Sequence, residues 1–210
     1  MPLALPDDKA YFALAIRKVS DAGRHSGMLY LSSDDDYKLL HLGQNFGLLN
    51  DAPGPEFYWT GCRLPETDRK FLAVICERIA TAKPDVPYGF DSAGFEIDRT
   101  TGMIKPGPLG KGYTCASFVL EVMKLAYIHL LKEDEWPENV EDDWQKYIVW
   151  VMANFWQAAP EQVAALEQDV GCRRFTPSQV VGSSTLVSPV GYEDAVAISA
   201  ALEMELLAAA

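Results

Sequence analysis

A glycine-rich loop that runs directly into an apolar helix is the feature that most constrains how this chain can fold. The loop is Gly110-Lys-Gly112, and the segment that follows, Tyr113-Thr-Cys-Ala-Ser-Phe-Val119, places Cys115 in the first turn of a helix that we expect to reach about residue 132. Thr114 is suited to cap this helix, because its side-chain oxygen can accept from exposed main-chain N–H groups. The positive end of a helix favours a thiolate over a thiol. The alternative interpretation is that Cys115 is a small buried apolar residue.

The remaining pattern predicts an α+β fold with a small antiparallel sheet. Short apolar runs bounded by turn residues predict strands at 24–31, 37–42 and 55–62, and a shorter one at 95–98. Apolar residues at helical spacing predict helices at 8–22 (capped by Asp7 or Asp8), 64–81, 139–156, 160–170 and 193–207, with a turn region before the last of these. We expect one compact domain, with a core at residues 1–135 and a helical extension at 136–210.

Composition excludes several classes of protein. The net charge of −12 disfavours binding to nucleic acid or to anionic membranes, although it is compatible with a protein partner. No apolar run approaches the roughly 18 residues of a membrane-spanning helix. The first residues lack the basic-then-apolar order of a secretory signal, and the four cysteines contain no C-x-x-C pair, so we expect a cytoplasmic protein with reduced thiols.

The chain has three histidines that could act as a base for Cys115. His129 is excluded, because in a continuous helix it would lie roughly 21 Å from Cys115. His25 opens a predicted strand, and Gly27, two residues on, would leave space beside its ring on the same face. His25 is therefore the expected base.

A third residue is expected to orient this base. His41 lies on the next predicted strand, where a hairpin would bring it near His25 and let it fix the tautomer. Gln44, Asn45 and Asp51 are weaker candidates for the same role. A zinc site built from both histidines and Cys115 is the competing chemistry, but no fourth ligand has a recognisable spacing, so we expect no metal or cofactor.

The order of these elements resembles a known family. The segments that carry the resemblance are His25-Ser-Gly-Met-Leu-Tyr-Leu31, Leu40-His41, Tyr88-Gly-Phe-Asp91 and Tyr113-Thr-Cys-Ala-Ser-Phe-Val119. Over about residues 20–132, the chain is similar to the circularly permuted NlpC-like branch of the papain-like cysteine hydrolases, which includes relatives of lecithin retinol acyltransferase. The long acidic loop between the two histidines and the helical region from residue 138 depart from that pattern.

The resemblance implies a thiol hydrolase of the permuted papain-like fold. Cys115 would be the nucleophile, His25 the general base and His41 the orienting residue, acting on an amide or ester bond of a peptide or other acyl substrate through a thioester. Tyr88, Tyr113 and Thr114 would line the oxyanion site or the pocket. Two alternatives stay open: an inactive member of the same fold that binds a protein, and a lipid acyltransferase or phospholipase-like enzyme.

Overall fold

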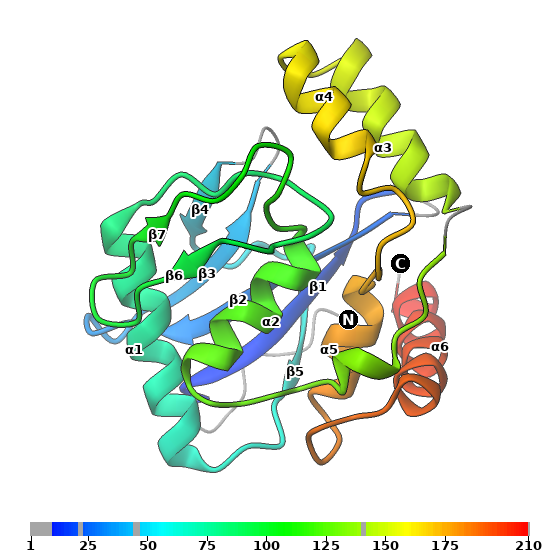
Figure 1. Cartoon of the computed structure of the whole chain (residues 1–210). Coiled ribbons are helices and arrows are strands. Elements are labelled where there is room, and N and C mark those ends of the chain that lie inside the picture. The colour runs from blue at the N-terminus through cyan, green and yellow to red at the C-terminus, as the bar shows by residue number, and fades with distance from the viewer. Residues whose placement is uncertain (1–9, 21–22, 44–46, 140–141, 210) are drawn as a thin grey trace.

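The computed structural model describes residues 10–20, 23–43, 47–139 and 142–209. It shows an α+β chain whose main element is a five-stranded antiparallel sheet with the strand order β4-β3-β2-β1-β5 (Figure 1). The strands are β1 (Phe12–Lys18), β2 (Arg24–Leu31), β3 (Tyr37–Leu42), β4 (Leu48–Asp51) and β5 (Tyr58–Gly61). A small second sheet pairs β6 (Glu96–Ile97) with β7 (Ile104–Lys105).

The predicted helix at 8–22 is wrong, because its apolar run forms the interior strand β1. The strand pairs with β2 on one side and with β5 on the other, and side chains on both of its faces are buried. Phe12, Leu14 and Ile16 face the helices, whereas Ala13 and Ala15 face the opposite layer. A strand covered on both faces has a continuous apolar sequence without alternation, which mimics a short buried helix. The proposed caps Asp7 and Asp8 lie outside the described residues.

Helices cover one face of the sheet and enclose the main core. They are α1 (Glu66–Ala82), α2 (Cys115–Leu125), α5 (Pro177–Ser183) and α6 (Tyr192–Ala209). Helix α5 lies against β1, β2 and α2, and α6 packs on α5 (Figure 1). Val180 and Val181 of α5 are fully buried in the same core as α1 and α2. The C-terminal part of the chain therefore completes the core around the sheet.

The other face of the sheet is covered by the connection between β4 and β5. These two strands are the opposite edges of the sheet, so residues 52–57 must cross from one edge to the other. Phe57 and Trp59 pack there on Ala13, Ala15, Leu29 and Leu39. The alanines leave room for the crossing chain, and the large aromatic side chains fill that room.

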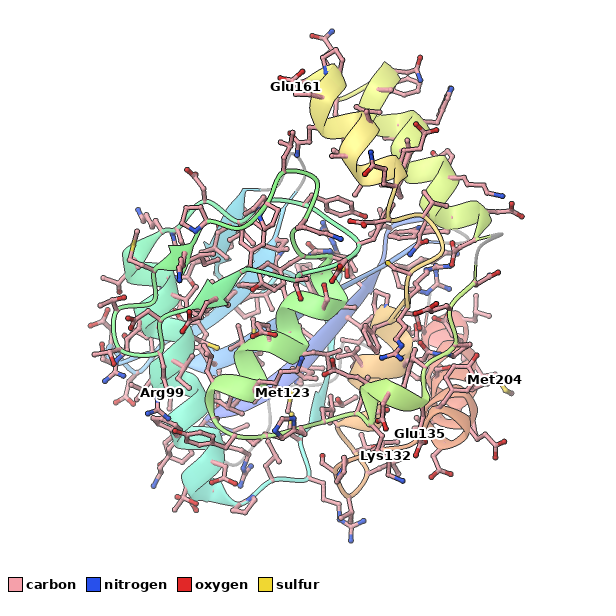
Figure 2. The ribbon with its side chains drawn as sticks, viewed as in Figure 1. Arg99, Met123, Lys132, Glu135, Glu161 and Met204 are labelled. Atoms are coloured by element: carbon pink, nitrogen blue, oxygen red, sulfur yellow. The ribbon has the colours of Figure 1, made fainter. Side chains whose placement is uncertain are left out.

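Helices α3 (Asp143–Asn154) and α4 (Pro160–Glu167) form a hairpin that projects from the rest of the molecule (Figure 1). Figure 2 shows Glu161 at its outer end. The hairpin has its own small core, which includes Phe90, Met152 and Leu166. The segment after α4 joins this hairpin to α5. The hairpin lies next to the start of α2, since Trp144 of α3 lines the same cavity as Thr114 and Cys115.

Two further expectations need correction. The helix that starts at Cys115 ends at Leu125 and not near residue 132, because the chain turns through Tyr127, whose φ is +60°. The predicted turn region before the last helix contains the helix α5, which begins at Pro177 behind a capping box formed by Thr176 and Gln179.

Candidate functional site

Cys115 is the first residue of α2, as the sequence predicts. Thr114 caps the helix by accepting a hydrogen bond from the Ser117 N–H at 3.1 Å, and the Ser117 hydroxyl accepts from the Thr114 N–H at 2.8 Å. This reciprocal pair satisfies two of the donors that a helix start leaves free. The first turn is therefore fixed, and Thr114 acts as a cap that also lines the cavity described below.

The loop before Cys115 is held against the segment 87–91. The Tyr113 N–H donates to the Pro87 carbonyl at 2.9 Å and the Gly112 N–H to the Asp91 carbonyl at 2.8 Å. At Gly89, an added Cβ would lie only 2.3 Å from the Gly112 nitrogen, so the two backbones can approach this closely only because a side chain is missing. The Lys111 ammonium bridges Asp91 and Asp169 at 2.7 Å each. These contacts hold in place the loop that leads to Cys115.

Tyr88 is held next to the cysteine by this contact between loops. Its phenol lies close enough to Cys115 and Arg174 for their charges to influence its pKa, which burial raises. Tyr113 does not reach the site, because its side chain is fully buried against Phe95 and Phe118 in the main core. The prediction that Tyr113 lines the pocket is wrong, whereas Tyr88 lies within the range of an electrostatic interaction with Cys115.

A cavity of about 250 Å³ opens onto Cys115. Besides the cysteine, it is lined by side chains from four other parts of the chain: Arg24, Thr114, Ala116, Trp144, Arg174, Phe175, Thr176, Pro177, Ser178, Ser199 and Glu203. Arg24 on β2 donates to Glu203 on α6 at 2.9 and 2.5 Å, and Ser178 also donates to Glu203. The sequence pattern gives no sign of these partners, because Arg24 and Glu203 are distant in the chain.

The two histidines form a hydrogen-bonded pair. His25 Nε2 lies 2.9 Å from His41 Nδ1, and His41 Nε2 lies 3.7 Å from an Asp51 carboxylate oxygen. The rings of both histidines contact Phe57, with centroids 6.2 and 5.5 Å away. The expectation that Gly27 leaves open space beside the His25 ring is wrong, because the His41 Cβ occupies that space, 2.8 Å from where a Cβ of residue 27 would be. Gln44 and Asn45 lie outside the described residues.

Burial keeps both imidazoles neutral. Desolvation, followed by the neighbouring His41 and Arg17, lowers the pKa of His25 from 6.5 to about 3. Desolvation also lowers the pKa of His41, although the Asp51 carboxylate opposes this change. Between two neutral imidazoles, the N–H of one ring donates a hydrogen bond to the unprotonated nitrogen of the other.

The thiol of Cys115 lies beside the residue that follows His25. Burial raises the pKa of this thiol, and a hydrogen bond from the Ser26 backbone opposes the rise. Side chains alternate along a strand, so His25 points toward Phe57 and Ser26 toward the helices. Within the described residues, no hydrogen bond joins the thiol to His25. The expected contact between nucleophile and base is absent from this arrangement, because the His25 ring and the Cys115 thiol lie on opposite faces of the sheet.

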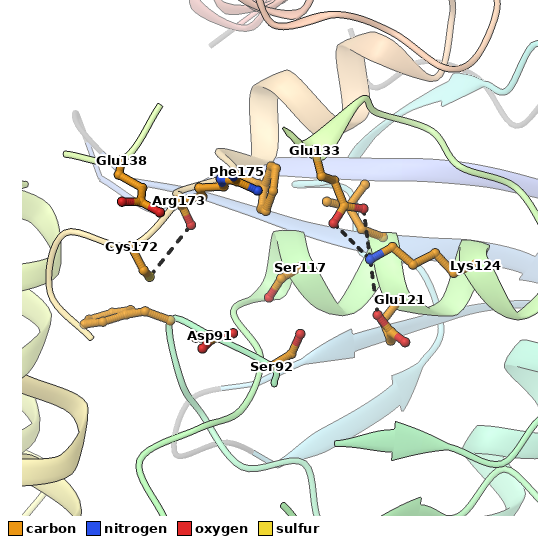
Figure 3. Close-up of a pocket in the computed structure, with 12 residues that line it drawn as sticks. Asp91, Ser92, Ser117, Glu121, Lys124, Glu133, Glu138, Cys172, Arg173 and Phe175 are labelled. Atoms are coloured by element: carbon orange, nitrogen blue, oxygen red, sulfur yellow. Dashed lines mark hydrogen bonds and ion pairs between the residues drawn. The ribbon is translucent and has the colours of Figure 1, made fainter. Parts of the chain in front are cut away.

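A second cavity, of about 390 Å³, lies on the other side of the segment 172–175 (Figure 3). In it the Lys124 ammonium lies between the carboxylates of Glu121 and Glu133, at 3.5 and 2.9 Å. Arg173 lines this second cavity and not the one at Cys115, whereas the next residue, Arg174, lines the cavity at Cys115. Of the two adjacent arginines, only Arg174 lines the cavity at Cys115, although both line a much smaller hollow beside Trp144.

His129 lies on the exposed chain beyond α2, not on the helix itself. Across the described ranges, no group of three or more histidine, cysteine, aspartate or glutamate side chains is placed as metal ligands would be. Among the helices described, none has the length and apolar character needed to cross a membrane. Comparison with known proteins found no matching family model, no matching curated protein and no matching solved structure.

Proposed function

We propose that this protein is a cysteine-dependent hydrolase of the permuted papain-like fold, in which Cys115 attacks an amide or ester carbonyl. The observation that carries the proposal is the position of Cys115, which begins a capped helix and lines a cavity of about 250 Å³. The Nε2 atom of His25 is bound by His41, which leaves the Nδ1 atom without a hydrogen bond within the described chain. A base that is oriented through one ring nitrogen and free at the other is the arrangement that nucleophile activation needs.

The reaction starts from a neutral thiol and a neutral imidazole. As the sulfur attacks the acyl carbon, His25 takes the thiol proton and later gives it to the leaving group, which leaves a thioester on Cys115. Water then attacks the thioester, with His25 again acting as the base. The Cys115 N–H at the start of α2 and the Tyr88 hydroxyl are the donors proposed for the oxyanion. The His25 ring lies on the Phe57 face of the sheet and the thiol on the helix face, so this step requires the start of β2 to rearrange before the ring can reach the sulfur.

A binding function without catalysis is the second candidate. It is favoured by the raised pKa of the Cys115 thiol and by the missing contact with His25, since both disfavour a thiolate in the resting protein. The same cavity would then hold a ligand without cleaving it. The two candidates differ in whether an acyl group is transferred to the sulfur.

Acyl transfer from p-nitrophenyl acetate tests the proposal. We expect mass spectrometry to find one acetyl group on Cys115, turnover to vanish in Cys115→Ser, and the rate to fall about 100-fold or more in His25→Gln, as is typical for loss of a general base. Cys172→Ser and His129→Gln are matched controls that should retain the wild-type rate. Equal rates for wild type and Cys115→Ser would refute catalysis. An acetylated Cys115 with no effect of His25→Gln would refute the role of His25.

A further inference from the structure

The cavity at Cys115 has a cationic side chain whose hydrogen-bonding capacity is largely unused. The Arg174 guanidinium lies over the Trp144 ring, 4.4 Å from its centroid, and Nη1 reaches the Asp142 carboxylate only at 3.4 and 3.5 Å. These are the hydrogen bonds that Arg174 makes within the described residues. Its Nε and Nη2 donors are therefore available beside a cavity that both Arg174 and Trp144 line.

The position of this guanidinium is fixed. Asp142 is 6% exposed and also caps α3 by accepting from the Gln145 N–H at 2.9 Å, so the carboxylate that holds Arg174 cannot swing away. Trp144 supports the flat face of the guanidinium, a contact that leaves its edge free for planar recognition of an anion. A guanidinium held in this way can bind a carboxylate through two parallel hydrogen bonds.

The other charges at the cavity do not compete for this role. Arg24 is already bonded to Glu203 through Nε and Nη2, and its Nη1 donates to the Ser20 and Gly23 carbonyls. Glu203 is in turn occupied by Arg24 and Ser178. The cavity is thus lined by one arginine that is paired within it and by a second, Arg174, whose ion-pair partner Asp142 is engaged through Nη1 alone. The remaining edge of the Arg174 guanidinium is the group at this cavity suited to bind a small anion.

We propose that Arg174 determines substrate specificity and that the cavity binds a small acyl compound with a carboxylate near the carbonyl that Cys115 attacks. The proposal rests on the proposed function for the identity of the reacting atom. Cys115 and Arg174 line the same cavity, and both influence the pKa of Tyr88, so the reacting sulfur and the anion-binding group belong to one site. The cavity, at about 250 Å³, is smaller than the usual range of drug-sized sites and suits a short acyl group.

Two alkylating reagents that differ only in charge test this proposal without requiring catalysis. Iodoacetate carries a carboxylate and iodoacetamide a neutral amide, and with both reagents sulfur displaces iodide and the thiol proton goes to solvent. The measured quantity is the ratio of the iodoacetate rate to the iodoacetamide rate at Cys115, obtained at one pH by peptide mass spectrometry. Because both rates depend on the same thiolate fraction, the ratio cancels the thiol pKa.

We expect this ratio at Cys115 to exceed the ratio at the half-buried Cys172 and to fall about tenfold in Arg174→Gln, the size of effect expected for one charge-assisted contact. Arg173→Gln is the matched control, since it removes the same charge from the neighbouring residue, which faces the second cavity. Arg174→Lys should restore part of the ratio. Circular dichroism confirms that each variant is folded.

An equal ratio at Cys115 and Cys172, or an equal fall in Arg174→Gln and Arg173→Gln, would overturn the proposal. Failure of Cys115 to react with either reagent in the folded protein would also overturn it, because the cavity would then not admit the anion. None of these outcomes depends on whether the protein hydrolyses p-nitrophenyl acetate. If Cys115 preferred iodoacetate but the protein did not hydrolyse p-nitrophenyl acetate, the anion site would be supported and the hydrolase proposal would be refuted.

Discussion

Replacing His25 with glutamine should flatten the dependence of stability on pH. The pKa of His25 is lowered from 6.5 to about 3, chiefly by burial, so below pH 6.5 the unfolded chain binds a proton that the folded chain does not. The stability associated with the neutral ring is therefore fully present above pH 6.5 and is lost as the pH falls toward 3. Glutamine does not titrate, so the variant lacks this loss.

The magnitude follows from the size of the pKa change. A full proton difference is worth about 1.4 kcal/mol per pH unit, and the unfolded His25 is half protonated at pH 6.5, so lowering the pH from 6.5 to 4.5 should remove about 2.3 kcal/mol from the wild-type protein through His25 alone. His41, whose pKa is also lowered, and the carboxylates titrate in both proteins. The difference between the two pH profiles therefore reports on His25 together with its hydrogen-bond partner His41.

Urea unfolding at the two pH values measures this difference. His129→Gln is the matched control, because it makes the same replacement at an exposed position. NMR titration of the imidazole protons should show no protonation of His25 at pH 4.5. If wild type and His25→Gln lost the same stability, or if His25 titrated near 6.5, the ring would be hydrated and the buried histidine pair would not exist.

Two further substitutions test how the approach to the cysteine is built. Gly89→Ala should lower the free energy of unfolding by about 1–3 kcal/mol, because its Cβ would lie 2.3 Å from the Gly112 nitrogen, whereas Gly61→Ala, with no atom within 4 Å of its Cβ, should cost much less in urea unfolding. Equal losses would show that the two backbones can separate cheaply. Thr114→Ala should cost about 1 kcal/mol in thermal unfolding through loss of the cap on α2, and Thr114→Ser should retain most of it; equal melting temperatures for the two variants would contradict the capping geometry.

The elements with clear local signals could be predicted from the sequence. The strands β2 and β3 have the predicted bounds, because turn residues interrupt their apolar runs on both sides. The start of α2 at Cys115 follows from the glycine loop and the threonine cap. The helix α5 had a readable signal as well, since Thr176-Pro-Ser-Gln179 has the spacing of a capping box with proline at the first helical position.

The predictions fail where contacts between distant parts of the chain determine the local structure. The run Phe12–Lys18 becomes a strand because β5 pairs with it from the far edge, which no local pattern reveals. The pairing of His25 with His41 follows from strand neighbours, but the side of the sheet on which Cys115 meets Ser26 depends on how α2 packs. Arg174 has no sequence signal as a site residue, because its supports, Asp142 and Trp144, are common residue types brought to it by tertiary structure.

The crossing of the chain from β4 to β5 also sets an order of assembly. Strands β1 to β4 form successive hairpins with short sequence separation, whereas β5 must return to β1, pairing Gly61 with Ala13. Contacts of larger separation cost more chain entropy and form later. The shelter of the histidines by Phe57 is therefore completed only when the last strand docks. Opening of that edge strand alone would readmit water to the imidazoles while the helix that begins with Cys115 stays folded.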